Sequence, residues 1–189
     1  IKPGNLLITC DDILKICDFS ISAELNLFQN KKKNDDDDDD DDKIETSSSN
    51  NFNNNEINPN LLTNSLSKFP IAQCTPMFQC PEMIDESVDE SLILREACKI
   101  DIWSSGITLY QLTSGHLPFE QAQTVHQIYE LIKASSKNKT IRMPNFLDRN
   151  LISLLNGMLE HDPVKRMSIK QIRDTEWFKK KHPIVAEEL

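Results

Sequence analysis

Apolar residues are spaced differently at the beginning of the chain and in its second half. Near the beginning, Leu6-Leu7-Ile8 and the run from Ile13 to Cys17 are short apolar segments separated by the polar stretch from Thr9 to Asp12. Two short apolar runs joined by a polar turn predict a β-hairpin. The first part of the chain is therefore expected to contain two paired strands.

The second half has the spacing of helices. The segment from Asp101 to Leu112 is apolar on more than one face, which predicts a buried helix. Two later stripes repeat at i, i+3, i+4 and i+7, the period of an amphipathic helix. Their residues are Val125, Ile128, Tyr129 and Ile132 in the first, and Leu151, Leu154, Leu155 and Met158 in the second, which Ile152 and Leu159 widen.

Polar residues at the right offsets predict where two of these helices begin. Asp148 precedes the second stripe and is placed to cap it. Ser168 and Gln171 have the spacing of a capping box, which predicts one more helix after residue 168. Trp177 and Phe178 follow, and we expect both to anchor this last helix to the core.

Residues 26–70 differ in composition from the segments on either side. Three Lys precede eight consecutive Asp (35–42), and runs of Ser and Asn follow. The Ser and Asn runs are interrupted by the isolated apolar residues Phe52, Ile57, Leu61 and Leu62. Such a segment cannot bury enough apolar surface to offset the entropy lost on ordering, so it is predicted to be a disordered insertion. We interpret it as solvated chain, with an acidic docking or phosphorylation segment as the alternative.

Charge and cysteine content exclude some classes of function. The net charge is −9, which argues against nucleic-acid binding as the main task. The five cysteines are an odd number without CxxC spacing, so buried reduced thiols in an intracellular protein are favoured over a disulfide framework or a zinc site. No apolar run approaches the length that spans a bilayer.

Four short motifs follow one another along the chain. Lys2-Pro3-Gly4-Asn5 comes first, and Asp18-Phe19-Ser20 begins thirteen positions after Asn5. Thr75-Pro76 and Cys80-Pro81-Glu82 come after the insertion, and His161-Asp162-Pro163-Val164-Lys165-Arg166 comes near the end. In this order they resemble the catalytic loop, the D-F-G motif, the A-P-E end of the activation segment and its arginine partner in protein kinases.

The resemblance implies an α+β, protein-kinase-like fold that consists of a mainly α-helical C-lobe with a short β-hairpin, the N-lobe being absent. Ile1 then stands at the Leu of H-R-D-L-x-x-x-N, so the catalytic Asp is expected directly before it. The implied segments are a catalytic-loop and D-F-G hairpin (1–25), the insertion in the activation segment (26–70), a helical C-lobe (71–183) and a C-terminal tail (184–189).

The resemblance also implies the cofactors ATP and Mg²⁺. Asn5 and Asp18 would hold the metal, because Mg²⁺ prefers oxygen ligands and keeps several waters. Lys2 would project its ammonium group toward the transferring γ-phosphate. Leu7 would contact the nucleotide, and Thr75 would hydrogen-bond the catalytic Asp and Lys2.

Four further residues are implied to have structural roles. Glu82 and Arg166 would form a buried ion pair that fastens the activation segment to the helical part, the alternative being a surface Glu and an unrelated Arg. Asp101 would accept backbone N–H bonds from the catalytic loop, a role compatible with a simple helix N-cap. Phe19 would serve packing and not chemistry.

A closer resemblance lies in the C-terminal strings. Leu155–Glu160, Lys165–Arg173 and Trp177–Pro183, together with Asp101–Ser104 and Phe78-Gln79, look like the liver kinase B (serine/threonine kinase eleven) type of kinase. This implies activation-loop Thr residues of AMP-activated-type kinases as substrates, and a pseudokinase adaptor and a helical-repeat scaffold as partners. It also implies an intracellular location, in the cytoplasm with the nucleus as a second compartment.

Two positions depart from the family pattern, and two other functions remain open. Ser20 replaces the D-F-G Gly, and Cys74 stands where this subfamily usually has Gly. The favoured function is a protein serine/threonine kinase of which this chain, lacking the upstream motifs, is expected to be inactive alone. A non-catalytic pseudokinase or scaffold module is the main alternative, and a calmodulin-dependent or AMP-activated type of kinase is the third.

Overall fold

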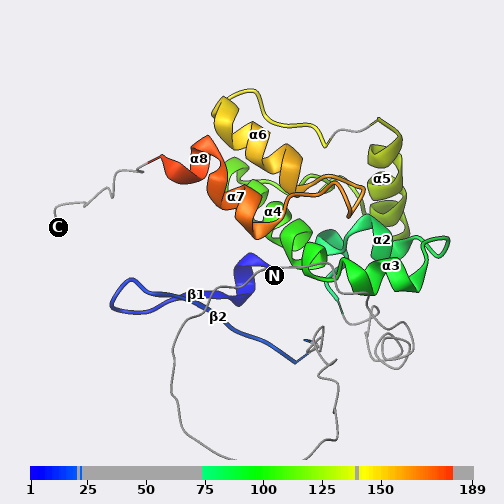
Figure 1. Cartoon of the computed structure of the whole chain (residues 1–189), viewed down its shortest axis with the longest axis horizontal. Coiled ribbons are helices and arrows are strands. Elements are labelled where there is room, and N and C mark those ends of the chain that lie inside the picture. The colour runs from blue at the N-terminus through cyan, green and yellow to red at the C-terminus, as the bar shows by residue number, and fades with distance from the viewer. Residues whose placement is uncertain (21, 23–73, 139–140, 181–189) are drawn as a thin grey trace, which may run out of the picture.

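The computed structural model describes residues 1–20, 22, 74–138 and 141–180, and it combines one hairpin with a helical body (Figure 1). The hairpin follows a short 3-10 helix, η1 (Pro3–Asn5), and consists of β1 (Leu6–Ile8) and β2 (Leu14–Ile16). The body contains η3 (Pro76–Phe78), α2 (Pro81–Ile84), α3 (Glu90–Arg95), α4 (Cys98–Ser114), α5 (Val125–Asn138), α6 (Arg149–Met158), α7 (Ile169–Asp174) and α8 (Glu176–Lys179). The α+β, mainly helical fold class is therefore confirmed.

The predicted hairpin is confirmed, with β2 shorter than the apolar run that predicted it. The strands are antiparallel, and Leu7 is paired with Lys15. The Thr9 amide donates to the Ile13 carbonyl at 3.0 Å, and Asp12 adopts a left-handed φ of 57° within the turn. An Asp side chain can support this backbone conformation through local hydrogen bonds.

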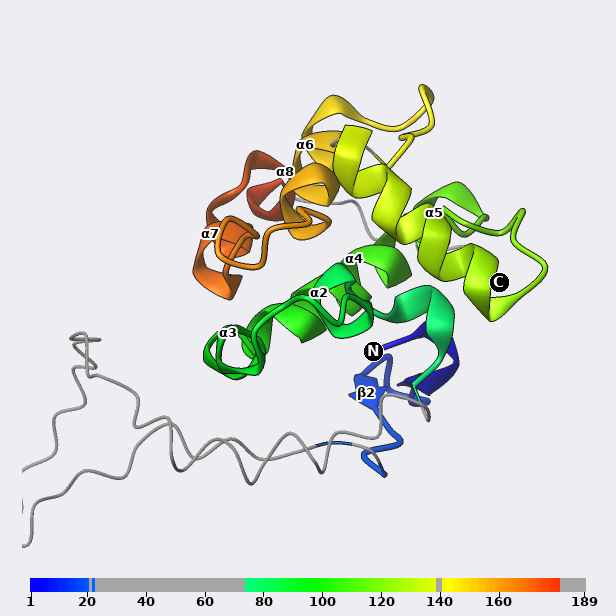
Figure 2. The same cartoon turned by 90° about the vertical axis from the view of Figure 1, so that its right-hand side faces the viewer.

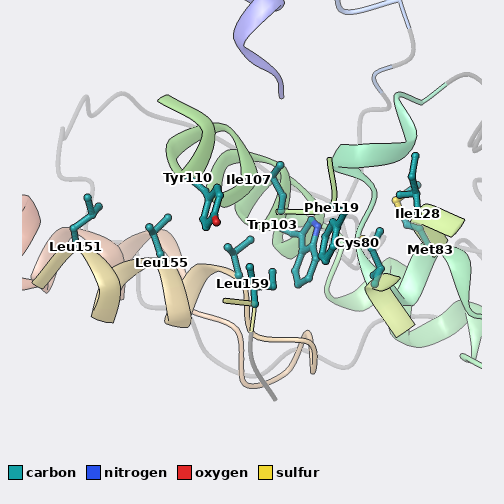
Figure 3. Packing of buried hydrophobic residues seen from close by; sticks show 12 residues of the cluster. Cys80, Met83, Trp103, Ile107, Tyr110, Phe119, Ile128, Leu151, Leu155 and Leu159 are labelled. Atoms are coloured by element: carbon teal, nitrogen blue, oxygen red, sulfur yellow. The ribbon is translucent and has the colours of Figure 1, made fainter. Parts of the chain in front are cut away.

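Helix α4 runs through the middle of the body, and α6 packs on it. The buried face of α4 includes Trp103 and Ile107, and Figure 3 shows Trp103 close to Cys80 and Phe119. A Cβ atom at Gly106 would lie 2.8 Å from Leu159 Cδ2, so the two helices approach this closely because residue 106 has no side chain.

Both predicted helix caps are confirmed. The Asp148 side chain accepts hydrogen bonds from the amides of Asn150 and Leu151 at the start of α6. Ser168 and Gln171 form a complete capping box at the start of α7. Helix α4 ends at its C-cap Gly115, whose φ of 79° lies in the left-handed region that glycine adopts most readily.

Three packing predictions have different outcomes, and only that for Phe178 is wrong outright. Phe178 is 51% exposed, so Trp177 alone of the pair packs against the core. Phe19 is 65% exposed, because the described residues place no apolar layer over the hairpin, so its packing role stays a prediction. Cys80 is buried but Cys10 and Cys98 are exposed, so the expectation of buried thiols holds for Cys80 and fails for the other two.

Two predicted segments lie outside the part of the chain that the structure describes. A further expectation concerns membrane-spanning helices. The predicted insertion at 26–70 and the tail at 184–189 lie outside the described residues. Among the helices within the described ranges, none has the length and apolarity needed to cross a bilayer.

The hairpin segment meets the helical body at the face of α4 (Figure 2). The Ile1 backbone nitrogen lies 3.1 Å from Ser104 Oγ, and Thr108 Oγ1 donates to the Ile1 carbonyl at 3.2 Å. Ser104 and Thr108 are one helical turn apart, so both hydroxyls lie on one face of α4. These contacts place the Lys2–Asn5 motif beside the body.

Candidate active site

The hairpin brings Asn5 and Asp18 together at its open end. Asn5 ends η1 directly before β1, and Asp18 follows β2 by two residues. The ladder continues past the strands, because the Cys17 amide donates to the Asn5 carbonyl at 2.9 Å. Asn5 Nδ2 donates to Asp18 Oδ2 at 3.3 Å, so an amide and a carboxylate meet at an exposed point.

Asp18 is held as a carboxylate in an unusual backbone conformation. Its φ is 62°, and Ser20 Oγ donates to its Oδ1 at 2.6 Å. The hydrogen bonds from the Ser20 hydroxyl and the Ser20 amide lower the pKa of Asp18 below its ordinary value, and Asn5 and Lys2 act in the same direction. Asp18 is therefore anionic at neutral pH, as a metal-ligating carboxylate must be.

The oxygens of Asn5 and Asp18 fit a magnesium ion. Mg²⁺ binds protein through one or two oxygen ligands and takes the rest from water and substrate phosphates. The exposed carboxylate of Asp18 leaves room for such additional ligands, and a half-turn of the Asn5 amide would present its Oδ1. Within the described ranges, no group of three or more His, Cys, Asp or Glu side chains could hold a metal ion. A site with two protein ligands is therefore the type that these residues offer.

Lys2 connects this end of the hairpin to the segment that follows the insertion. Its Nζ donates to Thr75 Oγ1 at 3.0 Å, and Thr75 is the N-cap of η3. Since the Lys2 ammonium also lowers the pKa of Asp18, it lies within electrostatic range of that carboxylate. The structure thus gathers four of the predicted site residues, Lys2, Asn5, Asp18 and Thr75, around one point.

Glu82 and Arg166 form a buried ion pair on the far side of η3. Arg166 Nη1 lies 2.7 Å from Glu82 Oε1 and Nη2 lies 2.8 Å from Oε2, which is a bidentate geometry. The side chains are 3% and 0% exposed. This pair joins α2 to the loop between α6 and α7, 84 residues further along the chain.

Arg166 has no unused donor. Its Nε donates to the Glu160 carbonyl at 2.8 Å, its second Nη1 hydrogen to the Lys99 carbonyl at 2.8 Å, and its second Nη2 hydrogen to the His161 carbonyl at 3.3 Å. With the two bonds to Glu82, all five guanidinium N–H groups are paired. The guanidinium carbon also lies 5.1 Å from the centre of the Trp103 ring, a cation–π geometry.

Three predicted site residues are not brought into these clusters. Leu7 lies on β1 and is 52% exposed. Asp101 lies in the first turn of α4 with an exposed side chain, and no hydrogen bond to that side chain occurs among the described residues. The N-cap of α4 is Ala97 rather than Asp101, so the simple capping role is wrong. Phe19 points into solvent, as described above.

Several residues that hold the site were not found from the sequence. His161 Nε2 lies 2.8 Å from Ser135 Oγ, and its ring meets Trp103 edge-on at 5.3 Å. The Lys99 Nζ donates to the Arg166 carbonyl. These contacts join distant segments, and no local pattern encodes them. Ser104 and Thr108 carried a usable signal, because these two hydroxyl residues are four positions apart and so share one face of a helix with apolar residues.

Comparisons with known proteins agree with this arrangement. Residues 60–178 match the protein kinase domain family, which is more than half of the chain. The chain therefore belongs to the protein kinase family.

Within that family, the chain is similar to serine/threonine kinases of the STK11 type, as its C-terminal strings predicted. It is 35% identical over 183 residues to the serine/threonine-protein kinase stk11 of Xenopus laevis and to STK11 of Homo sapiens. Each alignment covers 97% of this chain and 32% of the relative. The stk11 homolog of Dictyostelium discoideum is 30% identical over 185 residues, which are 98% of this chain and 24% of that protein. The chain thus spans about a third or less of the length of these relatives.

Proposed function

We propose that this chain carries the metal-binding and activation-segment part of an ATP-dependent protein serine/threonine kinase. The observation that supports this most is the cluster in which Asn5 Nδ2 lies 3.3 Å from Asp18 Oδ2 while Lys2 Nζ lies 3.0 Å from Thr75 Oγ1. Two oxygen ligands and one cation around a single exposed point are what phosphoryl transfer requires of a protein, because its catalysis is mainly positioning and charge stabilisation.

The residues of the cluster would divide this task. Bound Mg·ATP would supply the phosphoryl group and neutralise its charge. Asp18 and Asn5 would hold the metal, and the hydrogen bond to Thr75 would fix the Lys2 ammonium where negative charge develops. The Glu82–Arg166 pair would keep Thr75 in place, because it fastens the segment that follows Thr75 to the helical body.

The substrates and partners of the whole protein are further parts of the proposal. The relatives are named serine/threonine-protein kinases, which supports a protein Ser or Thr as phosphate acceptor. By likeness to their type, we propose the activation-loop Thr of another kinase as substrate, a pseudokinase adaptor and a helical-repeat scaffold as partners, and a cytoplasmic and nuclear location. We also propose the division into segments 1–25, 26–70, 71–183 and 184–189, and that residues 1–189 alone do not transfer phosphate.

The substitution Asp18→Asn tests the proposal in a protein that includes an N-lobe. It keeps the size of the side chain and removes the charge on the metal, so transfer of radiolabelled phosphate is expected to fall at least about 100-fold. The melting midpoint should stay nearly unchanged, since Asp18 is exposed.

Asp12→Asn is the matched control. Asp12 has a left-handed φ of 57°, close to the 62° of Asp18, but lies in the hairpin turn. Phosphate transfer should be normal in this variant. Substantial remaining activity in Asp18→Asn, or an equal loss in both variants, would show that the assignment of the metal ligand is wrong.

One observation favours the pseudokinase alternative. Ser20 Oγ donates a hydrogen bond to Asp18 Oδ1 at 2.6 Å. The glycine that kinases usually have at this position has no side-chain donor. If this bond only orients the carboxylate, Ser20→Gly should leave activity equal or higher. A protein that binds nucleotide but transfers no phosphate, both with Ser20 and with Gly, would instead be a pseudokinase.

A further inference from the structure

A groove of about 300 Å³ lies on the helical body behind the Glu82–Arg166 pair. One wall is formed by α2 and the segment that leads into α3, and the other by the loop between α6 and α7. Figure 1 shows that loop, in orange, beside α2. The groove is separate from the Asn5–Asp18 cluster, whose residues do not line it.

The walls of the groove are partly apolar. Pro81, Val88 and Leu92 contribute carbon surface from the α2–α3 side, and Pro163 contributes it from the opposite loop. Val88 and Leu92 are half-buried, so their side chains are packed below and open to solvent above. Such a surface favours a ligand with an aliphatic part.

The charged groups in the groove do not balance. Four carboxylates line it, and two of them have a cationic partner: Glu82 pairs with Arg166, and Asp162 pairs with Lys165 at 3.0 Å. Asp85 and Glu160, on opposite walls, have no ion pair among the described residues. Lys133 on α5 influences Asp85 electrostatically, and Lys165, which also lines the groove, interacts with Glu160, in both cases without an ion pair.

Both remaining carboxylates have an unused oxygen. Asp85 Oδ1 accepts hydrogen bonds from the amide and hydroxyl of Ser87, and Glu160 Oε1 accepts one from the Asp162 amide. Within the described ranges, no hydrogen bond reaches Asp85 Oδ2 or Glu160 Oε2. Two acceptor oxygens with negative charge are therefore available in a partly apolar groove.

We propose that this groove docks a linear peptide segment of a partner protein through one arginine or lysine side chain with apolar neighbours. The aliphatic stem of such a side chain covers apolar surface while its charged end reaches carboxylates. A guanidinium group can also donate to two acceptors at once. Asp85 and Glu160, which both line the groove, would supply the acceptors, and the apolar neighbours would contact Val88 and Leu92.

A pentapeptide probe tests the proposal with the whole chain. Acetyl-Ala-Leu-Arg-Leu-Ala-amide is titrated into the methyl-labelled protein, and the same peptide with citrulline in place of arginine serves as its neutral isostere. We expect shifts of the Val88 and Leu92 methyl signals but not of Val125, which is exposed elsewhere on α5. The citrulline peptide should bind at least about tenfold more weakly, the loss expected for one hydrogen bond to a charged group.

A pair of matched variants locates the charge that the probe detects. Asp85→Asn with Glu160→Gln should weaken the arginine peptide by a similar factor, whereas Glu86→Gln with Glu90→Gln, which removes two neighbouring exposed charges outside the groove lining, should leave binding unchanged. Equal binding of both peptides, equal loss in both variant pairs, or no shift at millimolar peptide would overturn the proposal. Because binding is measured without nucleotide, failure here leaves the proposed kinase function untouched.

Discussion

At the scale of single residues, the Arg166 side chain connects several segments of the chain through its hydrogen bonds. All five of its donors are paired and its guanidinium lies on Trp103, so its environment fits the shape of that group as well as its charge. A lysine has three donors and no planar fork. The anchor therefore depends on the identity of residue 166.

We expect Arg166→Met to lower the free energy of unfolding by about 3–5 kcal/mol, because Glu82 is left as a buried unpaired charge. Arg166→Lys should recover only part of this loss. Arg173→Lys, at an exposed position of α7, is the control and should change stability by less than about 0.5 kcal/mol. Urea unfolding measures all three variants.

The second partner of the ion pair gives a stricter measurement. If the buried charge causes the loss, Glu82→Leu combined with Arg166→Met should be more stable than Arg166→Met alone, since no charge then remains buried. A double variant that loses the sum of both single effects would contradict this explanation.

His161 is expected to make stability depend on pH. Burial lowers the pKa of His161 from its ordinary value of 6.5 and outweighs the opposing hydrogen bond with the Ile132 backbone. Arg166 lowers the pKa further, while Glu160 and Glu82 raise it. The unfolded state therefore binds a proton at a higher pH than the folded state. This contribution to stability is present above pH 6.5 and is lost as the pH falls below it.

Melting midpoints at pH 7.5 and pH 5.5 measure this effect. We expect the midpoint of the unsubstituted protein to fall between the two pH values, and to fall less in His161→Gln. His116→Gln is the control, because His116 is exposed and pairs with Glu120 at 3.2 Å on the surface. Equal falls in all three proteins would assign the pH dependence to other groups.

At the scale of elements, the sequence predicted those with a strong local signal. The hairpin and the helices α4, α5 and α6 followed from apolar spacing, and the caps at Asp148 and Ser168 followed from side-chain chemistry. Helices α2, α3 and α8 are only four to six residues long, too short to show a period. Tertiary contacts decide such elements.

The residues of the candidate site also fall into those that local motifs predict and those that depend on tertiary contacts. The Asn5 and Asp18 motifs, and the order of Thr75, Glu82 and Arg166, could be read from the chain. The capping role of Asp101 was wrong, because where a helix starts depends on tertiary contacts as well as on local residue types. The packing of Phe19 stays a prediction, because it depends on what lies opposite the side chain. The contacts of His161 and Lys99 belong to this second group.

Helix α4 gives a prediction at this scale. Gly106→Val should destabilise the protein by about 1–3 kcal/mol, because its side chain would meet Leu159 and Met158 where α6 approaches most closely. Leu112→Val places the same β-branched residue at a 63% exposed position of the same helix and should have only a small effect. Chemical denaturation of both variants separates the clash from helix propensity.

At the scale of the whole molecule, residues 30–66 should contribute little to stability. Their composition provides few apolar side chains to bury, and shortening a loop lowers its closure cost by only about 0.6 kcal/mol per halving. Deleting them should therefore raise the melting midpoint by at most about 4 °C.

A length-preserving variant separates charge from length. Replacing Asp35–Asp42 by serines keeps the number of residues and removes eight charges. We expect its midpoint to match that of the intact chain. A marked fall on deletion would show that Phe52, Ile57, Leu61 or Leu62 packs against the helical body, and the disorder prediction would then be wrong.

The hairpin docks on the helical body through the contacts of Lys2 with Thr75 and of Ile1 with α4, and this docking takes place within one chain. Residues 23–73 link the hairpin to the helical body covalently, so docking of the hairpin is an intramolecular event with a high effective concentration. A single peptide-bond cleavage in that tract would make it bimolecular. After such a cut the linker would no longer hold Asn5 and Asp18 near the helical body, so the docking of the hairpin would be weaker. We expect this weakening to be irreversible, because a hydrolysed peptide bond does not re-form on its own.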